Sequence, residues 1–519
     1  MYGFVDTLPG SAQSASLSLQ TVFDGMNLDE ELTDEDGSFI TLTVSGRSNT
    51  TYRRNIIPIP GMEGAWEDAN GYQDPRSITV KFKIKDKTNN GFRERLKRLN
   101  SLLVGSKKVL TFTDEDALFY ASLEELELPE EESNDLVGNL HFICSDPLKY
   151  GPEITRRLLP DVSTIKNEGT ANAKPIIEMT AKESVTYALI QNQNDLEQLG
   201  DEWYPKYLMI GKPHEVDEKP FERYVRRYYT NANTLVGWTK ASNSDIDGGT
   251  VAGNIVSRNN RFVADSYGEG SNWHGPAIKT SLESPIRDFR LSAFVGFLNQ
   301  QQAAMVGRLE IYLLDVNGNA VAKMALKDTS ATRAAVFAEM RAGDRETNDM
   351  IISGFPARET GWNNFSGQLR ISREWDDRKK ENVWSAYVAL VDTSTGRHHA
   401  RRIVSEWRDG GKYTRNVAQI VVHMGAVGTH TPVHANSGVS SIILEEIIQE
   451  PAGIPYIAHE GDKITFDCMT RDVYLNGEPV PDLMEDFGWS YFDLVKGDNQ
   501  LVVHPNAFDT TVRYRPPYR

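Results

Sequence analysis

The segment that most constrains the fold is residues 141–152, HFICSDPLKYGP. It begins with the apolar end of a strand and then places prolines at Pro147 and Pro152. Proline lacks a backbone N–H and restricts the residue before it, so regular structure is not expected to continue through this segment. A second break, NEGTANAKP at 167–175, precedes the next apolar run. The sequence therefore predicts a domain boundary near residue 160.

The length and composition are those of a globular protein with several cores. The chain has 519 residues, 39% hydrophobic and 25% charged, and this length is typical of about three domains. No apolar run approaches the roughly 18 residues of a membrane-spanning helix. The first ten residues lack the basic and apolar parts of a secretion signal. We therefore expect no membrane insertion, and assembly in a cytoplasm.

The charge and the cysteines exclude several function classes. A net charge of −17 would repel a phosphate backbone, which argues against direct sequence-specific nucleic-acid binding. The two cysteines, Cys144 and Cys468, lie in apolar strand-like runs and are interpreted as buried, reduced thiols. No Cys/His spacing indicates a zinc site. We expect no metal and no cofactor.

The first 160 residues are predicted to form strands and one helix. The apolar residues Phe92, Leu96, Leu99 and Leu103 recur at helical spacing, with Asn89 or Asn90 as the expected cap. Elsewhere apolar and polar residues alternate, which is typical of half-buried strands. These strands are expected at 16–24, 39–44, 77–85, 109–113, 118–123 and 136–143.

The next domain is predicted to be a discontinuous β-sandwich. Two strands at 176–179 and 185–190 begin it, but the remaining strands of the expected type occur only after residue 456. We therefore assign 161–199 and 456–519 to one sandwich and 200–455 to an insert. Insertions of this size are tolerated where the two ends of the inserted part lie close together on an exposed loop.

Several short motifs of these outer parts resemble one known family. At the boundary, a strand ending in an aromatic-rich run is followed by Asp-Pro, Tyr-Gly and Gly-Thr-Ala-x-Ala-x-Pro. Upstream, a Pro-Gly-x-x-Gly turn precedes Arg-x-Ile-x-Val at 76–80. Near the end come I-x-x-D-C, V-x-L-N-G, L-x-x-G-x-N and V-x-Y-R, in that order. In this order along the chain, the motifs resemble distal tail proteins, the baseplate hub of long, non-contractile-tailed phages of Gram-positive hosts.

The resemblance implies a fold, a location and a set of partners. It implies an N-terminal β-rich domain, 1–160, that forms a homo-hexameric ring at the virion tail tip, followed by a galectin-like C-terminal sandwich. The expected partners are the tail tube protein and tail-associated lysin or receptor-binding proteins. The implied function is structural and non-enzymatic.

The insert has the pattern of another β-sandwich, of jelly-roll type. Short alternating segments separated by Gly, Asn and Asp predict strands over most of its length. Asn317-Gly318 is expected to be the turn of a hairpin. The segment 331–341, ATRAAVFAEMR, is the one expected short helix, with Ser330 as its cap.

Tryptophans suggest a task for the insert. Trp384 shares a strand face with apolar residues and is expected to be buried. Trp273, Trp362 and Trp407 lie instead in polar, turn-rich segments, where an aromatic ring beside polar groups suits a sugar. We therefore expect a carbohydrate-binding-like insert that contacts host cell-wall polysaccharide. The alternatives are burial of these rings under their own loops and a spacer role.

A tail-associated glycan hydrolase is the rival function. Such enzymes need two carboxylates about 5 to 9 Å apart. The segment Glu374-Trp375-Asp376 approaches a known glycosidase pattern but lacks its last carboxylate, and Glu310 with Glu406 is the remaining pair considered. The acidic segment 245–249, DIDGG, is a candidate calcium loop of the insert.

Overall fold

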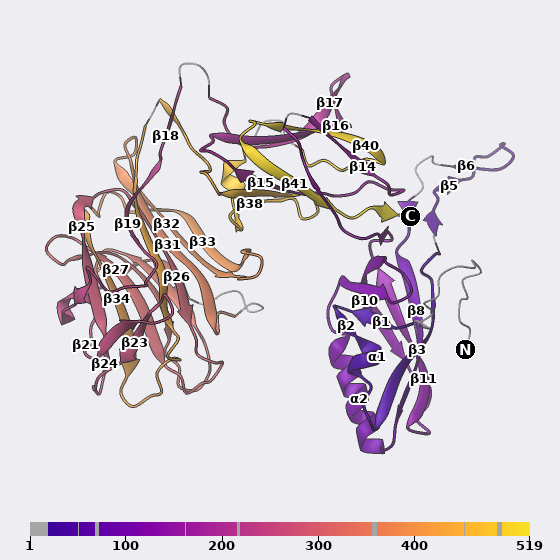
Figure 1. Ribbon diagram of the computed structural model, residues 1–519, viewed down its shortest axis with the longest axis horizontal. Coiled ribbons are helices and arrows are strands. Elements are labelled where there is room, and N and C mark those ends of the chain that lie inside the picture. Colours follow the sequence, from indigo (N-terminus) through magenta and orange to yellow (C-terminus); the bar gives the residue numbers. More distant parts are fainter. Residues whose placement is uncertain are drawn as a thin grey trace.

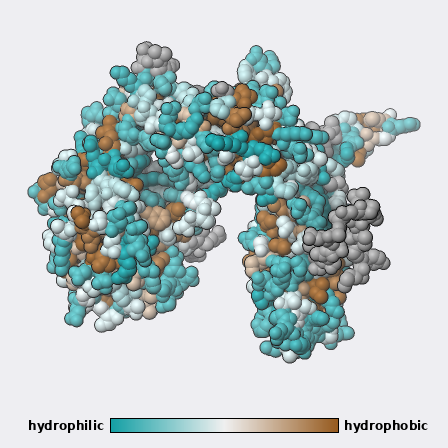
Figure 2. Space-filling model, in the orientation of Figure 1, coloured by the Kyte–Doolittle hydropathy of each residue, from teal (hydrophilic) through white to brown (hydrophobic). Residues whose placement is uncertain are grey.

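We describe a computed structural model, which places residues 19–49, 51–67, 72–160, 162–214, 218–354, 361–450, 452–484 and 490–519. The regular structure is almost entirely β, as predicted. Among these residues the α-helices are α1 (Leu28–Glu31) and α2 (Asn89–Leu102), and neither is long and apolar enough to cross a membrane. Figure 1 shows three parts in a row, with a sandwich between the N-terminal part and a larger β-rich part. The face of the molecule seen in Figure 2 is mainly hydrophilic.

The N-terminal part is a sheet with the order β2-β1-β9-β10-β11-β8-β3. Its strands are β1 (Thr21–Phe23), β2 (Met26–Asn27), β3 (Gly37–Ser45), β8 (Arg76–Asp86), β9 (Lys108–Phe112), β10 (Leu118–Glu127), β11 (Asp135–Cys144) and the short β12 (Lys149–Tyr150). On β8, Ile78, Val80, Phe82 and Ile84 are all fully buried. The predicted alternation is therefore confirmed, and it places one core on one side of the sheet.

The amphipathic helix packs on this core as predicted. Residues Phe92, Leu96 and Leu99 of α2 are buried against the sheet. The N-cap is Thr88, whose hydroxyl accepts a hydrogen bond from the Gly91 amide. The expected cap, Asn89 or Asn90, was wrong because the helix starts one residue earlier and includes both.

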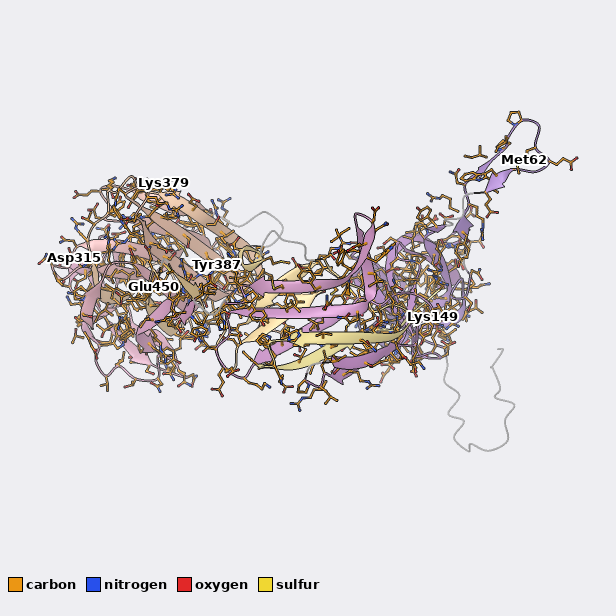
Figure 3. All side chains as sticks on the ribbon, turned by 90° about the horizontal axis from the view of Figure 1, so that it is seen from above. Met62, Lys149, Asp315, Lys379, Tyr387 and Glu450 are labelled. Carbon is orange, nitrogen blue, oxygen red and sulfur yellow. The ribbon has the colours of Figure 1, made fainter. Side chains whose placement is uncertain are left out.

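An arm of paired short strands projects from this part. It consists of β4 (Tyr52–Arg53) with β7 (Tyr72–Gln73) and β5 (Ile56–Ile57) with β6 (Trp66–Glu67). Figure 3 shows its tip, near Met62, extended away from the rest of the chain. Apolar side chains on it are exposed, including Ile56 at 59% and Met62 at 51%.

The central part is a two-sheet sandwich built from two separated segments. Its sheets have the orders β13-β41-β15-β37-β38-β39 and β14-β40-β16-β17. The strands are β13 (Ile154–Arg157), β14 (Val162–Asn167), β15 (Ile176–Ala181), β16 (Tyr187–Leu199), β17 (Glu202–Gly211), β37 (Lys463–Asp467), β38 (Asp472–Leu475), β39 (Glu478–Pro479), β40 (Gly497–His504) and β41 (Phe508–Tyr514). A short η2 (Pro481–Leu483) follows β39, and β42 (Pro517–Tyr518) returns to β12. The predicted interruption of this sandwich is confirmed, because β15 pairs with β37 and β41.

One detail of the boundary differs from the sequence analysis. The segment after residue 200 was assigned to the insert because it becomes polar and aromatic. In the structure it is β17, which pairs along its whole length with β16 in the central sandwich. The exposed Trp203 and Tyr204 lie on the protruding end of this hairpin, which explains the surface-like composition. The domain limits themselves stay a prediction.

The insert is a second two-sheet sandwich. Insert sheet A has β22-β23-β35-β26-β31-β32-β33, with β19 on β35. Insert sheet B has β20-β25-β34-β27-β28-β29-β30, with β24 beside β34 and β21 beside β24. Sheet A consists of β19 (Tyr224–Thr230), β22 (Asn254–Ser257), β23 (Phe262–Ser266), β26 (Phe289–Phe297), β31 (Phe365–Asp376), β32 (Glu381–Val391), β33 (His398–Arg408) and β35 (Gly438–Ile447). Sheet B consists of β20 (Thr239–Lys240), β21 (Thr250–Val251), β24 (Trp273–Gly275), β25 (Ala277–Ile286), β27 (Gly307–Leu314), β28 (Ala320–Asp328), β29 (Phe337–Ala342), β30 (Asp349–Gly354) and β34 (Val417–Val427). Side chains from both sheets form one core between them.

Two local predictions in the insert have different outcomes. The hairpin turn at Asn317-Gly318 is confirmed by the pairing of β27 with β28. The helix expected at 331–341 was wrong, since the segment is a turn followed by β29. Val336, Ala338 and Met340 are buried at alternate positions, and β28 and β30 pair with β29 on its two sides. The alternation of buried residues, which favours a strand, therefore outweighed the alanine content, which favours a helix.

The two ends of the insert lie side by side. Strands β18 (Lys219–Phe221) and β36 (Gly453–Pro455) pair in parallel, with Lys219 opposite Gly453. Close to this stem, a Cβ added to Gly211 would lie 2.9 Å from the Ile457 side chain. The chain therefore leaves the central sandwich and returns to it at nearly the same place, as expected for an insertion.

Candidate functional site

Insert sheet B carries different side chains on its two faces. Along β27, Leu309, Ile311 and Leu313 belong to the core between the sheets. Successive side chains of a strand point to opposite faces, so the residues between them lie on the outer face. From four neighbouring strands this outer face carries Arg308, Glu310, Tyr312, Lys323, Lys327, Glu339, Arg341 and His423.

Strand register brings these polar residues together. Tyr312 is opposite Lys323, and Arg308 is opposite Lys327, in the β27–β28 pair. Lys323 is in turn opposite Arg341 in the β28–β29 pair. Directly opposite side chains in antiparallel strands are about 4.5–5.5 Å apart at Cβ, so these charges form one cluster.

The segment 241–251 covers part of the outer face. Ile246 is buried with Tyr312 and Val421 in a small apolar cluster outside the main core. The Asp247 amide donates to the Tyr312 hydroxyl at 3.0 Å. The Asp247 carboxylate accepts two hydrogen bonds from Arg341, at 2.7 and 3.0 Å, and one from Lys323. The outer face is therefore a partly closed site rather than an open sheet surface.

Two glycines allow this segment to lie so close to the sheet. Gly249 has φ +97°, and a Cβ there would lie 2.5 Å from the Trp273 carbonyl oxygen. Gly248 has φ +75°, and its Cβ would lie 2.8 Å from an Arg345 guanidinium nitrogen. Left-handed backbone and close approach are both conditions that favour glycine.

Glu310 is the centre of the charge cluster. It is fully buried and lies 2.9 Å from the Lys323 ammonium and 3.2 Å from the Arg308 guanidinium. The Tyr312 hydroxyl donates to it at 2.8 Å. Burial by itself would raise the pKa of Glu310, but Lys323, His423 and Arg308 outweigh it and hold that pKa well below 4.5. Glu310 is therefore an ionised structural carboxylate.

His423 completes the buried network. Its Nδ1 lies 2.8 Å from Glu310, and because the carboxylate only accepts, Nδ1–H is the donor. Burial lowers the pKa of His423, against the effect of Glu310, which favours a neutral ring. Its Nε2 is buried and has no hydrogen-bond partner among the described residues.

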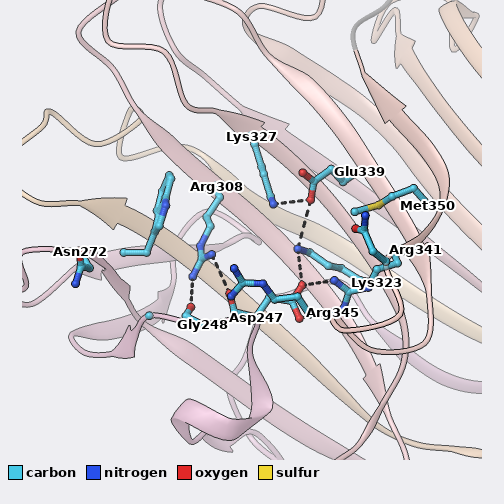
Figure 4. Close-up of a pocket in the computed structure, with 13 residues that line it drawn as sticks. Asp247, Gly248, Asn272, Arg308, Lys323, Lys327, Glu339, Arg341, Arg345 and Met350 are labelled. Atoms are coloured by element: carbon cyan, nitrogen blue, oxygen red, sulfur yellow. Dashed lines mark hydrogen bonds and ion pairs between the residues drawn. The ribbon is translucent and has the colours of Figure 1, made fainter.

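A cavity of about 560 Å³ lies beside this network and is lined by two of its cations, Arg308 and Lys323. Figure 4 shows the residues that line the cavity. This volume is within the usual range for small-ligand sites, about 300–1,000 Å³. Its polar lining comes from strands β27 to β29 and from three loops, and it includes five cationic side chains and two carboxylates. The charged lining residues are Arg308, Lys323, Lys327, Arg341, Arg345, Asp247 and Glu339. Trp273, Asn272 and Asn348 also line the cavity.

The three predicted tryptophans are not brought together. Trp273, on β24, is half-buried at the cavity, with the Arg308 guanidinium 4.9 Å from its ring centroid. Trp407, on β33 of insert sheet A, is half-buried and lies 6.4 Å from the Trp384 ring. Trp362 is 1% exposed, and its indole N–H donates to the Ala400 carbonyl. Trp362 therefore offers no ring face to a sugar in this structure, whereas burial of Trp384 is confirmed.

The carboxylates considered for hydrolysis do not form a pair. Glu310 is buried beneath the outer face of insert sheet B, whereas Glu406 is exposed on β33 of insert sheet A, beside Arg408. Glu374 accepts hydrogen bonds from Arg223, and Asp376 pairs with Arg408. A general acid must carry a proton near working pH, which the lowered pKa of Glu310 opposes.

The acidic residues of segment 245–249 are held by cations of the chain itself. Asp245 pairs with Lys279, and Asp247 with Lys323 and Arg341. Within the placed part of the chain, no group of three His, Cys, Asp or Glu residues has a metal-binding arrangement. Cys144 and Cys468 are free and buried, as predicted.

Sequence reasoning missed most residues of the cavity. The available signal was charged side chains on one face of strands that are otherwise apolar, as at Arg308 and Glu310, then Lys323 and Lys327. A strand with one solvated face gives the same pattern, so composition alone does not separate a site from a surface. Attention to tryptophans found Trp273 alone among the cavity residues.

Comparison with known proteins finds similarity to one family. A family model described as a siphovirus-type tail component, C-terminal domain, matches residues 432–518. The distal tail protein of Bacillus phage SPP1 is 30% identical over 170 residues, which are 32% of this chain and 66% of that protein. The match thus spans slightly less than two thirds of the relative.

Two solved structures are also similar. The crystal structure of the SPP1 distal tail protein, described as a paradigm of the hub adsorption apparatus in phages that infect Gram-positive hosts, is 26% identical, with a TM-score of 0.31. It covers 37% of this chain and 74% of that one. The CBM2 module of the evolved distal tail protein of Lactobacillus casei BL23 phage J-1 is 15% identical and covers 44% and 98%, with a TM-score of 0.34. Since both TM-scores are low, the assignment rests on the two sequence matches. On these, the chain is similar to the distal tail proteins of phages.

Proposed function

We propose that this protein is a structural hub at the phage tail tip, joining the tail tube to the host-adsorption apparatus. The observation that supports it is the family match at both sequence and motif level. The proposed partners are the tail tube protein, tail-associated lysin or receptor-binding proteins and further copies of the chain in a hexameric ring. The proposed role requires no catalysis.

The projecting arm supports self-assembly. Its side chains Ile56, Ile59 and Met62 are exposed by 59%, 45% and 51%. Clustered exposed apolar side chains mark surfaces that associate, and a closed ring buries one such surface of every copy. Native mass spectrometry of the full chain should show a hexamer that Ile59→Asp disrupts. Val236→Asp, at a residue that is 86% exposed in the insert, is the matched control. A monomer at high concentration, or a ring insensitive to Ile59→Asp, would contradict this part.

The insert is proposed to bind a host cell-surface glycan. The observation that supports this proposal is the cavity of insert sheet B, where Trp273 lies beside charged and amide side chains. Sugar sites combine an aromatic surface with polar groups that bind hydroxyls. Several copies in a ring would raise the apparent affinity by roughly 10²–10⁴ over one weak site if one polymer reaches more than one copy.

The test compares the labelled full chain with a chain that lacks residues 213–455. Because Gly211 and Ile457 lie close together, a short Gly-Ser bridge closes the gap. The full chain should label host cells, and the shortened chain should form the same ring without labelling. Equal labelling by both chains, or none by the full chain, would refute glycan binding by the insert.

A further inference from the structure

The cavity has a charge opposite to that of the chain. The protein carries a net charge of −17, yet five cations and two carboxylates line this one cavity. Adding the buried Glu310 beneath it leaves five cations and three carboxylates, so the cluster has a surplus of two positive charges. The neutral His423 does not change this balance.

Arg345 contributes to the surplus from the surface, but most of the cluster is buried. Arg308, Lys323 and Arg341 are each at most 5% exposed, and like charges held together away from water destabilise each other. Burial, and then repulsion by Lys323, lowers the pKa of Lys327. Glu310 and Asp247 instead raise the pKa of Lys323, so the cations of the cavity are unequally compensated. An anion at the cavity would reduce the repulsion between Lys323 and Lys327.

Polar groups at the cavity mouth remain available. Arg345 forms no ion pair with any residue in the described ranges, although it lies beside Gly248. The side-chain amides of Asn272 and Asn348 likewise have no hydrogen-bond partner within those ranges. One guanidinium and two amides therefore face the cavity with free donors, next to Trp273.

We propose that this cavity takes a negatively charged saccharide unit, with Arg345 and Lys327 contacting its anionic group and Asn272 and Asn348 its hydroxyls. The inference rests on the proposed glycan binding and adds the substrate class. Because Arg308 lies over the Trp273 ring, the ring holds that guanidinium in the cavity wall as well as offering its uncovered part to the sugar. A carboxylate and a phosphodiester share the required chemistry.

The test measures binding of the full chain to three immobilised polymers: polygalacturonic acid, poly(glycerol phosphate) and neutral dextran. At least one anionic polymer should bind, dextran should not, and binding should weaken as NaCl rises because salt screens the charges. The preferred anionic polymer distinguishes a carboxylate from a phosphodiester. Equal binding of dextran, or no binding of either anionic polymer, overturns the proposal.

Charge-removing variants assign the site. Arg345→Gln should weaken binding by roughly tenfold or more, since charge-assisted hydrogen bonds have effects of this size. Lys327→Gln should act in the same direction, with melting temperature measured to confirm the fold. Arg378→Gln, an exposed charge at the far turn of insert sheet A, is the matched control and should stay within about twofold. An unaffected Arg345→Gln chain overturns the proposal. If wild-type chain labels host cells while both variants label them equally, only this inference fails; if wild-type chain labels none, the proposed function fails.

Discussion

Replacing Glu310 with Gln tests whether the charge cluster is held together as the structure indicates. The change keeps the side-chain shape but removes the carboxylate that contacts Lys323, Arg308 and His423. The remaining buried or half-buried charges near it would be four cations against Asp247 and Glu339. Every lost attraction is inside the protein, because Glu310 has no exposed surface.

The size of the effect follows from this burial. Removing one partner of a buried ion pair costs about 3–5 kcal/mol, because the other charge remains buried without compensation. Here the replaced carboxylate pairs with the three cations Lys323, Arg308 and Lys327, so we expect the free energy of unfolding of the insert to fall by an amount in that range. For a domain of this size it corresponds to a fall in melting temperature of about 6–20 °C.

Scanning calorimetry of the full chain measures the effect, since domains can unfold in separate transitions. The matched control is Glu406→Gln, whose carboxylate is exposed and pairs with Arg408 at the surface, and it should change stability by less than about 1 kcal/mol. A Glu310→Gln chain within about 1 kcal/mol of wild type would refute the account of the network. If the wild-type chain releases reducing ends from host polysaccharide and Glu310→Gln does not, the result would instead support the hydrolase hypothesis.

Three further predictions follow from burial and charge. The pKa of Glu310 is lowered on folding, so its contribution to stability is present above its unfolded-state pKa and is lost as pH falls through its folded-state pKa. The lowered pKa of His423 acts in the same direction. Urea unfolding at a series of acidic pH values should therefore show a loss of stability that is smaller in Glu310→Gln. Trp362→Ala should cost about 3–5 kcal/mol, read by thermal unfolding, because it empties a fully packed core site; a smaller loss than an exposed-tryptophan change would contradict its placement. Burial raises the pKa of Cys144 to about 11 and that of Cys468 further, so neither thiol should react with a thiol reagent at pH 8 until denaturant is added, and rapid reaction of the native chain would show that they are accessible.

Much of the fold could be predicted because alternation reports directly on which face of a strand is buried. It located β8 and the pairs of the central sandwich, including the return of the chain at 464–468. It failed at 331–341, where alanines suggested a helix. There Asp328 holds the turn by accepting from the Ala335 amide, and the pairing with two neighbouring strands outweighs helix propensity.

The site could be predicted only in part, because it depends on long-range register. Local composition identified Trp273 and Trp362 alike, since both lie in polar segments. The exposure of the two rings differs because the loop of Trp362 folds inward. Its indole N–H donates to the carbonyl of Ala400, which is 38 residues away in sequence. The cavity itself needs Arg341 opposite Lys323 and Asp247 over both. No local pattern contains that information.

The attachment of the insert determines which way its cavity faces. The stem of β18 and β36 alone would be a two-stranded hinge. A second contact lies elsewhere, where Arg370 of insert sheet A binds Glu478 of the central sandwich and the His398 amide donates to the Gly477 carbonyl. Arg397 also pairs with Asp467. Two separate attachments fix an orientation that one flexible linker would leave free, so a load on the insert would pass into the central sandwich. In a ring, such attachments would point every copy's cavity in the same direction relative to the ring axis, which is the condition for one wall polymer to engage several copies.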